Sequence, residues 1–288
     1  MTDGGGRLVA PGARRRLLDG VLNLLTLLGV LAILLPLLWV LSTSLRSNAE
    51  LYSTPIPLIP REFSLIQYER LFQPGYVSFL DYYVNSLIVS FGVVLTTTVI
   101  ATLGGYGLTR LDIPYKRTFA RVILFGYMFP PILLAIPMYV FWRQLGLINS
   151  YVGLTLAITA TSLPFCLWLM WKFFQTVPIS LEESAMMSGA SRFRAFYEIA
   201  LPIAKPGIIA VALFSFSIAW NAYTIPKIIM PDSDKWVLTV GIDTLTLADQ
   251  VLWGEIMAAS VLAIVPPILF VFFLQKYFLR GFRVTGMN

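Results

Sequence analysis

The sequence predicts an all-α membrane protein with six transmembrane helices and a cytoplasmic two-helix loop between the fourth and the fifth. The chain of 288 residues is 57% hydrophobic and has a mean hydropathy of +0.77. Only 12% of its residues are charged, whereas soluble domains carry about 25%. Its apolar runs reach the length of about 20 residues that a helix needs to cross a bilayer. These observations exclude a soluble globular domain.

The chain begins with a polar tail and a first apolar run. Residues 1–20 are rich in Gly and Arg and are expected to form a cytoplasmic N-terminal tail. The run that follows, residues 21–44, could also be a signal peptide that starts at Arg14–Arg16. It is longer than the apolar part of a signal peptide, about 7–15 residues, and no small-x-small cleavage site ends it. We therefore interpret it as an uncleaved first span.

A proline-broken segment separates the first span from the second. Its prolines make residues 45–83 unsuitable for a span, and two short amphipathic pieces, 65–72 and 77–83, are expected on the membrane surface. The second span, 84–108, carries small residues near its end that let another helix approach closely. These residues are Gly104, Gly105 and Gly107.

Prolines also fall inside the third span, which is expected as one kinked helix over residues 118–145. In a membrane, a kinked backbone is tolerated only where protein or a water-filled path satisfies its free carbonyls. A polar segment is expected between the fifth and the sixth span, and residues 281–288 are expected to form a cytoplasmic tail. The predicted spans are about 21–44, 84–108, 118–145, 152–171, 205–222 and 252–274.

The distribution of Lys and Arg predicts the topology. Six spans put both termini, the basic loop 110–121 and the loop between spans four and five on one side. That side holds 15 of the 21 Lys and Arg residues, and the other side holds 6. Because basic loops face the cytoplasm, we expect the termini and both loops there. The net charge of +6 thus reports topology and not a nucleic-acid-binding face.

The sequence lacks the residues that several kinds of chemistry require. The chain has no His, and its single cysteine, Cys166, lies in an apolar run and is expected to be a small core residue. No G-x-x-x-x-G-K-[ST] sequence is present, so we expect no P-loop nucleotide site. The predicted spans nearly lack ionisable residues, whereas an ion-coupled carrier needs acids at membrane depth. A stand-alone carrier or channel is therefore the weaker alternative, and Gly- and Pro-interrupted spans disfavour a static receptor or scaffold.

The longest polar interruption in the second half of the chain is residues 177–207, here named the docking loop. Ser180 and Glu183 have the spacing of a capping box, in which each side chain bonds the backbone N–H of the other. Gly189 permits the left-handed conformation that stops a helix, so a first helix of about two turns is expected.

A second helix of the docking loop is expected over residues 192–200, capped by Ser191 and ended with the help of Pro202. The residues alone leave two interpretations open. The loop is either a solvated connector or an element seated in a partner's groove, to which its methionines would adapt.

The docking loop resembles the signature loop of permease subunits of bacterial ABC importers, E-A-A-x-x-x-G, separated by nine residues from I-x-L-P. Glu183–Ala185, Gly189 and Ile199–Pro202 occupy that spacing. Other pieces resemble, in family order, the carbohydrate branch that is similar to the maltose-system G subunit. They are Asn85–Leu87, Tyr106–Arg110, Gly146–Tyr151, Trp220–Asn221, Met257–Ala259 and Gln275–Gly281. The resemblance covers roughly residues 20–286.

The resemblance implies a transport subunit of the bacterial inner membrane that is not an enzyme and binds no cofactor or metal of its own. Its implied partners are a second homologous permease subunit, two copies of a P-loop ATPase that hold ATP and Mg, and an extracytoplasmic solute-binding protein. The ATPases would push the loop helix and rock the spans from inward-open to outward-open. The solute is implied to be a sugar or a sugar-like molecule, and oligosaccharides, trehalose-like disaccharides and glycerol phosphates all fit.

Three groups of site residues are implied. Those expected to couple to the ATPase are Glu183, Ser184, Ala185, Met186, Met187 and Gly189. Trp220 and Asn221 are candidates for the solute pathway, because aromatic faces stack on sugar rings and amides bond hydroxyls, although Trp220 also suits an interfacial anchor. Those expected to contact the binding protein, with a solvated turn as the alternative, are Pro231, Asp232, Ser233 and Asp234.

Two residues of the docking loop depart from the family pattern. Ser184 replaces the commoner Ala, and Ser188 stands where the family usually has Asp. Both are small and polar, so docking is expected to be kept while the choice of partner differs. The chain ends in Met287-Asn288 without the usual final Lys, which puts a regulatory contact of this tail with the ATPase in doubt.

Overall fold

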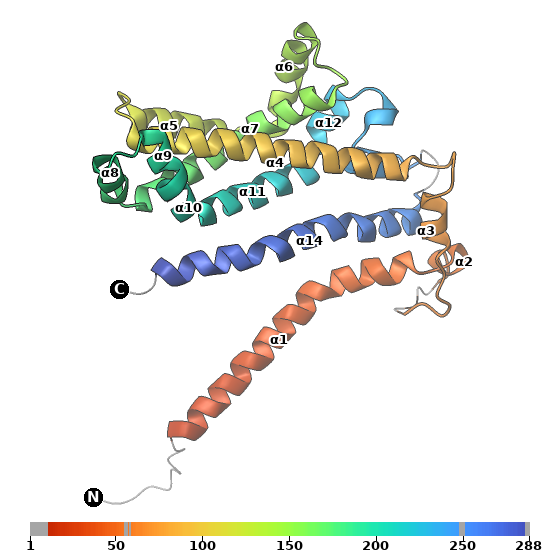
Figure 1. Cartoon of the computed structure of the whole chain (residues 1–288). Helices are drawn as coiled ribbons and strands as arrows, with labels where there is room; N and C mark the ends of the chain where they lie inside the picture. Colours follow the sequence, from red (N-terminus) through yellow and green to blue (C-terminus); the bar gives the residue numbers. More distant parts are fainter. Residues whose placement is uncertain (1–10, 55–56, 58, 248–250, 286–288) are drawn as a thin grey trace, which may run out of the picture. The chain divides into compact units, whose positions relative to one another are not determined.

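The computed structural model describes residues 11–54, 57, 59–247 and 251–285, which are mostly helical (Figure 1). Within this part, the extended pairing is an isolated bridge between Thr246 and Val251. The chain forms two compact units. Of the described residues, one unit contains those from Pro11 to Glu69 together with Trp253–Val261, and the other contains those of Arg70–Leu252 and those from Leu262 to Thr285. The described residues confirm the helical fold.

Four helices of the described part are long and apolar enough to cross a membrane. They comprise Leu18–Ser44, Phe79–Arg110, Tyr151–Thr176 and Trp253–Lys276. Two bent pairs pass the same test together: Lys116–Gly126 with Pro131–Gln144, at 97°, and Arg192–Ile203 with Lys205–Trp220, at 72°. Each predicted span overlaps one of these helices or pairs. Counting each pair as one span gives six, and six crossings stay a prediction.

The first unit begins with α1 (Pro11–Ser44). This helix starts inside the predicted tail, because Ala, Leu and Arg favour helices and Pro suits a first helical position. Residues 1–10 of the tail lie outside the described residues. After α1, Gln67 Nε2 donates to the Arg46 carbonyl at 3.0 Å and to Asn48 Oδ1 at 2.8 Å. Gln67 and Arg46 are fully buried, so this proline-broken segment has an ordered polar centre.

The chain also contains two short helices after α1 and a last long helix. α2 (Asn48–Leu51) and α3 (Ile66–Leu71) follow α1, and α3 corresponds to the first expected amphipathic piece. α14 (Trp253–Thr285) carries a Pro pair inside it and continues into the predicted C-terminal tail. Residues 286–288 of that tail lie outside the described residues.

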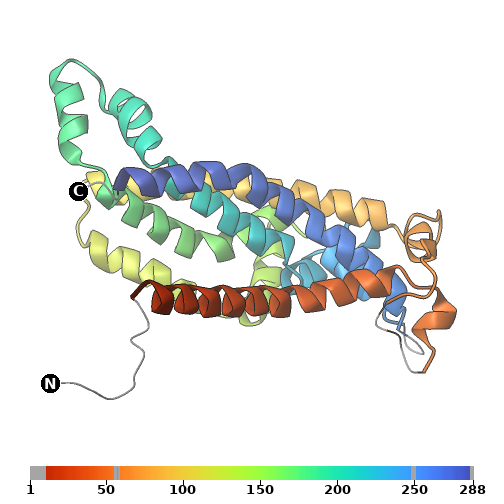
Figure 2. The same ribbon diagram turned by 90° about the horizontal axis from the view of Figure 1, so that it is seen from below.

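The core of the second unit consists of α4 (Phe79–Arg110), α7 (Tyr151–Thr176) and α11 (Lys205–Trp220), which pack against one another (Figures 1 and 2). The second expected amphipathic piece, 77–83, is wrong, because from Phe79 it forms the first turn of α4. Its Phe79 and Tyr82 continue the buried face of that helix, so it does not lie apart on a surface.

Glycine permits the closest approach between α4 and α7, as predicted. A Cβ on Gly105 would lie 2.8 Å from the backbone carbon of Met170, and one on Gly104 would lie 2.5 Å from Leu167 Cδ1. A Cβ on Gly107 would meet, within 4 Å and among the described residues, only Leu111 Cδ1 at 3.6 Å. The same two helices also share hydroxyl bonds, at 2.8 Å between Thr96 and Thr159 and at 3.2 Å between Thr97 and Ser162.

The third predicted span is broken and not kinked. α5 (Lys116–Gly126) and α6 (Pro131–Gln144) meet at 97°. Pro131 is favoured at the first position of α6 but forces the residue before it out of the helical region. That residue, Pro130, is extended at φ −65° and ψ 139°. α5 thus ends at Gly126, and the extended Pro130 followed by Pro131 starts α6 in a new direction.

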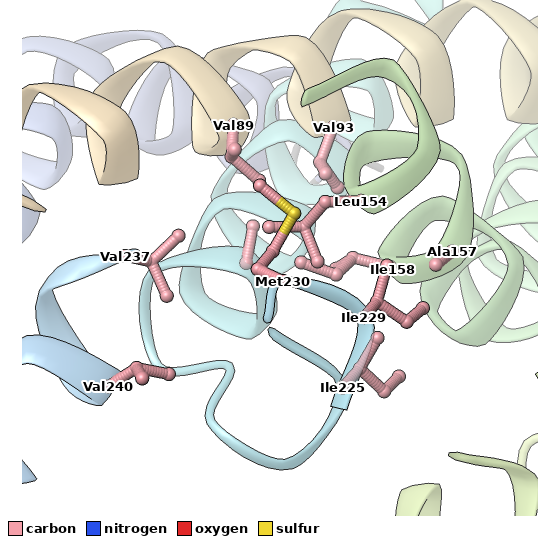
Figure 3. Packing of buried hydrophobic residues seen from close by; sticks show 11 residues of the cluster. Val89, Val93, Leu154, Ala157, Ile158, Ile225, Ile229, Met230, Val237 and Val240 are labelled. Carbon is pink, nitrogen blue, oxygen red and sulfur yellow. The ribbon is translucent and has the colours of Figure 1, made fainter. Parts of the chain in front are cut away.

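The segment 224–245, expected to be a polar loop, contains helices and has a buried apolar side. It contains α12 (Thr224–Ile229), a 3₁₀ turn (Ser233–Lys235) and α13 (Leu238–Asp243). Figure 3 shows its apolar side chains, among them Met230, against those of α4 and α7. The cluster contains Val89, Val93, Leu154, Ala157, Ile158, Ala219, Ile225, Ile229, Met230, Val237 and Val240.

Candidate functional site

The docking loop, residues 177–207, opens with α8 (Ile179–Met187). The N-cap residue is Pro178, which has no side-chain acceptor, and Ser180 lies exposed inside the first turn. The predicted capping box of Ser180 and Glu183 is therefore wrong. It requires a helix that begins two residues later, whereas α8 starts as soon as α7 has ended.

α8 ends in a glycine turn, as predicted. Gly189 has φ +93°, in the region that favours glycine. Its N–H donates to the Met186 carbonyl at 3.0 Å, and the Ala190 N–H donates to the Ala185 carbonyl at 3.0 Å. This pair of bonds satisfies two of the carbonyls that a helix end leaves open.

The second helix of the docking loop is longer than predicted. Ser191 caps α9 (Arg192–Ala195) by accepting from the Arg194 N–H at 3.2 Å, as expected. A π-helical turn, Phe196–Ala200, and α10 (Leu201–Ile203) then carry the helix past Pro202. The prediction that Pro202 helps to end it is wrong. The wider π turn accommodates a ring without an N–H, and the chain bends before α11 instead.

A buried ion pair fixes α8 to the end of α4. Arg110 Nη2 lies 2.7 Å from Glu182 Oε1, and Arg110 Nε donates to the same oxygen at 2.8 Å. The side chains of Arg110 and Glu182 are only 9% and 3% exposed. Tyr106 Oη donates to Glu182 Oε2 at 2.8 Å, and Arg110 Nη2 donates to the Val177 carbonyl at 2.7 Å. The carboxylate thus has a charged partner and a neutral one, which a buried charge requires.

Aromatic rings hold the second helix at the same place. The Tyr106 ring centroid lies 4.6 Å from that of Phe196 in the π turn and 5.5 Å from that of Phe174 in α7. Phe196 and Phe174 belong to a buried cluster that includes Cys166, which confirms the expected core role of the cysteine.

Sequence reasoning missed Glu182, Arg110 and Tyr106 as a group. Glu182 was overlooked beside Glu183, which has the family spacing but is exposed in the structure. The usable signal was the spacing of Tyr106 and Arg110, which lie one helical turn apart where an apolar helix ends. Two hydrogen-bond donors on one face of a helix end indicate that an acceptor lies nearby.

The residues expected to couple to the ATPase lie together in α8 and the turn after it. Glu183, Ser184, Met187 and Gly189 are exposed, whereas Ala185 and Met186 are half-buried. Met187 is 90% exposed. Large apolar side chains are also exposed on the second helix, namely Phe193, at 74%, and Tyr197.

The residues expected to contact a binding protein, Pro231–Asp234, are exposed on segment 224–245. Their backbone is held from below by Asn85, whose Nδ2 donates to the carbonyls of Asp234 and Trp236 at 3.0 Å each. Tyr151 Oη donates to Asn85 Oδ1 at 2.7 Å.

Two further bonds support this turn. Asn149 Nδ2 donates to Asp232 Oδ2, and Lys235 Nζ donates to the Asn149 carbonyl at 3.1 Å. The exposed turn is therefore a fixed surface, since four groups of residues 232–236 are bonded to Asn85 of α4 or to Asn149 in the turn before α7.

The two solute-pathway candidates differ in access. Trp220 is buried, its Nε1 donates to the Ala263 carbonyl at 3.0 Å, and its ring stacks on Phe216 at 5.7 Å. Its ring face is thus covered by the chain itself in this conformation. Asn221 is exposed and donates to the Ser217 carbonyl at 2.8 Å.

An exposed charge cluster lies on segment 224–245. Lys227 Nζ and Tyr223 Oη each donate to Asp243 Oδ2 at 2.9 Å. The bond from Lys227, and then that from Tyr223, lowers the pKa of the Asp243 carboxyl. The bond to Asp243 raises the pKa of the Tyr223 hydroxyl. Among the described residues, no group of His, Cys, Asp and Glu is placed to hold a metal ion.

The chain is similar to membrane components of transport systems. Residues 98–284 match the family described as "Binding-protein-dependent transport system inner membrane component". The diacetylchitobiose uptake system permease protein NgcG of Streptomyces coelicolor is 31% identical over 262 residues, which cover 90% of this chain and 86% of that protein. The trehalose/maltose transport system permease protein MalG of Thermococcus litoralis is 29% identical, covering 88% of this chain and 91% of that protein.

A solved structure shares the fold. It is a chain of a bacterial ABC transporter involved in the import of the acidic polysaccharide alginate. The TM-score is 0.79 at 24% identity, with 96% of this chain and 100% of that chain covered. At this identity the likeness supports the architecture alone.

Proposed function

Because the chain belongs to the family of binding-protein-dependent transport system inner membrane components, we propose that it is the transmembrane permease subunit of an ATP-driven importer. It forms half of the translocation pathway for a sugar or sugar-like solute and couples to a cytoplasmic ATPase through residues 178–202. ATP and Mg belong to the ATPase, and a second homologous permease subunit supplies the other half of the pathway.

The proposal rests on one short helix, α8, which is bonded to α4 through a buried side chain and exposes apolar surface at its end. α8 is held on Glu182, which is buried, while Met187, 90% exposed, projects from its last turn. Exposed apolar side chains gathered in one loop mark an interaction site, and methionine adapts to the groove of a partner. The loop therefore presents an exposed apolar surface to an ATPase, of which two copies serve the two permease subunits.

The proposed topology places α8 and its exposed Met187 in the cytoplasm of a bacterial cell. The side that carries 15 of the 21 Lys and Arg residues holds both termini, the loop 110–121 and the docking loop. Positively charged loops stay on the cytoplasmic side of the inner membrane. Segment 224–245 then faces outward, where a solute-binding protein arrives.

Segment 224–245 is the proposed contact for that binding protein. Pro231–Asp234 are exposed on a backbone that Asn85 fixes from below. A preorganised surface loses less conformational entropy on binding than a mobile loop does. The solute is proposed to be a sugar or sugar-like molecule, in keeping with the two relatives whose transport systems are named for diacetylchitobiose and for trehalose and maltose.

The substitution Gly189→Asp tests the coupling role. Gly189 has φ +93°, so a side chain there strains the turn that ends α8 and adds a carboxylate to the docking surface. In proteoliposomes with the ATPase and the binding protein, we expect solute uptake to fall by about tenfold or more, while the isolated ATPase stays active.

Gly75→Asp is the matched control. Gly75 has φ +81°, and a Cβ added there, as at Gly189, would meet no described atom within 4 Å, but Gly75 lies outside the docking loop. Uptake by this variant is expected to equal that of the wild type. Normal uptake by Gly189→Asp, with the protein present in the membrane, would sink the coupling assignment.

A further inference from the structure

One turn of α4 holds every part of the docking loop. Arg110 binds Glu182 of α8 and the carbonyl of Val177, the residue that caps α7. Tyr106, one turn earlier, binds Glu182 and packs its ring on Phe196 of the π turn. The end of α7, the helix α8 and the second helix of the loop therefore converge on residues 106–110.

The covalent connections of α8 are bent and not helical. Pro178 is extended before it, at ψ 124°, and Gly189 has φ +93° after it. Neither link continues the helix, so α8 is not a straight extension of α7 or α9, and its side-chain contacts with α4 are a direct route for a displacement. Charge-assisted hydrogen bonds are shorter and stronger than neutral ones, and the contacts of Arg110 with Glu182 are of this kind at 2.7 and 2.8 Å.

The turn that receives these bonds is fixed to α7. Gly105, next to Tyr106, leaves no room between the two backbones, since a Cβ there would meet the Met170 backbone at 2.8 Å. Packed helices with so little free space move together and do not deform. A displacement of residues 106–110 must therefore carry α4 and α7 as one body.

We propose that Arg110 and Glu182, with Tyr106 beside them, form the joint that transmits a displacement of α8 to α4 and α7. This inference rests on the proposed function, in which an ATPase displaces α8. In this role Arg110 and Glu182 act through α8 and α4, so they are positioning residues. Docking and transmission are thereby divided between two adjacent acids: Glu183 belongs to the exposed docking surface and Glu182 to the joint.

The test separates docking from transmission in the complete reconstituted importer. Docking is measured by the yield of a thiol-to-amine crosslink from Met187→Cys to the ATPase. Transmission is measured as solute imported per ATP hydrolysed. In Glu182→Gln, which keeps the side-chain shape and removes the charge, we expect the crosslink to persist and the transport ratio to fall about fivefold or more.

Two further variants sharpen the test. Arg110→Gln is expected to lower the transport ratio as Glu182→Gln does, and the double variant to be no worse than either, because both remove one interaction. The control is Glu198→Gln, which breaks the exposed pair of Glu198 with Arg194 in the same loop and is expected to change neither readout.

Each outcome decides a separate claim. An unchanged transport ratio in Glu182→Gln and Arg110→Gln, with the crosslink kept, overturns the joint and leaves the proposed function standing. If Met187→Cys gives no crosslink in an otherwise wild-type importer that still transports, the proposed coupling through this loop fails instead. Should Glu182→Gln not accumulate in the membrane, Tyr106→Phe decides, because it removes one bond to Glu182 and keeps the ring on Phe196. A lowered ratio in that variant supports the joint, and an unchanged one overturns it.

Discussion

The two ends of α4 hold their neighbouring segments by different interactions. At residues 106–110, α4 holds α8 through a buried ion pair, and Tyr106 adds a ring contact to Phe196 of the second loop helix, which lies in an apolar cluster. Toward its start, at residues 85–93, it holds segment 224–245 through neutral hydrogen bonds and a shared apolar cluster. Met187 of the docking loop is 90% exposed, whereas Met230 of segment 224–245 is fully buried.

This difference indicates two mechanical roles on one helix. A segment whose apolar side chains are shared with the core cannot leave without opening that core, so segment 224–245 moves with α4 and α7. Within α8 itself only Glu182 is buried, so α8 can be tilted or released while the apolar cluster around Phe196 and Phe174 stays closed. Substitutions in segment 224–245, in α4 and in the docking loop test whether the two segments differ in this way.

The largest effect on folding is expected from Met230→Ala. Removing a buried methionine side chain costs the transfer free energy and leaves a cavity, together about 2–5 kcal/mol. The free energy of unfolding, measured by denaturant titration in detergent micelles, should fall by that amount, and hydrogen exchange should rise along α4 and α7 as well. Met187→Ala is the matched control and should change this free energy by less than about 0.5 kcal/mol. Equal effects of the two substitutions would break the comparison.

A smaller effect is expected from Asn85→Leu. This substitution leaves the carbonyls of Asp234 and Trp236 without the Asn85 amide, at a cost of about 1–3 kcal/mol. Hydrogen exchange followed by mass spectrometry should show faster exchange over residues 231–238 and no change over the docking loop. Asn221→Leu, at an exposed amide, is the control and should leave the exchange of residues 231–238 as it is. Faster exchange in the docking loop of Asn85→Leu would show that the two ends are not independent.

The smallest effect is expected from Asp243→Asn, and it depends on pH. The folded pKa of Asp243 lies below its ordinary 3.8. The stabilisation is therefore fully present above the unfolded pKa and is lost as the pH falls through the folded pKa. Because Lys227 and Asp243 are 41% and 42% exposed, the pair contributes about 0.2–1 kcal/mol at neutral pH.

The difference in free energy of unfolding between wild type and Asp243→Asn should thus be constant above about pH 5 and shrink as acid protonates the wild-type carboxyl. Lys227→Met should follow the same profile, because it removes the same pair. A difference that grows in acid would contradict the assigned sign.

The long apolar helices and the docking loop could be predicted because their signals are local. Apolar length alone predicts α4 and α7, and Gly189 and Ser191 mark the turn between the loop helices through their backbone preferences. The break between α5 and α6 was signalled by its prolines. Whether prolines kink or break a helix depends on what surrounds them, which a local pattern does not contain.

The sequence pattern favoured Glu183 over the buried Glu182 for a different reason. Glu182 and Glu183 are adjacent, and which of them faces α4 depends on the residue at which α8 begins. The capping-box pattern favoured a start after Ser180, but α8 begins at Ile179. The buried character of segment 224–245 was likewise hidden, because its turn residues are polar and its apolar partners, such as Val89 and Leu154, are far away in the sequence.

The burial of Cys166 has a practical consequence for labelling this protein. The chain has one thiol, and that thiol is fully buried among apolar side chains of the α7 cluster. Water-soluble maleimides and spin labels react with accessible thiolates, so they should leave Cys166 untouched in the folded chain. Engineered cysteines on the docking loop or on Pro231–Asp234 can therefore be modified selectively without first replacing the native one.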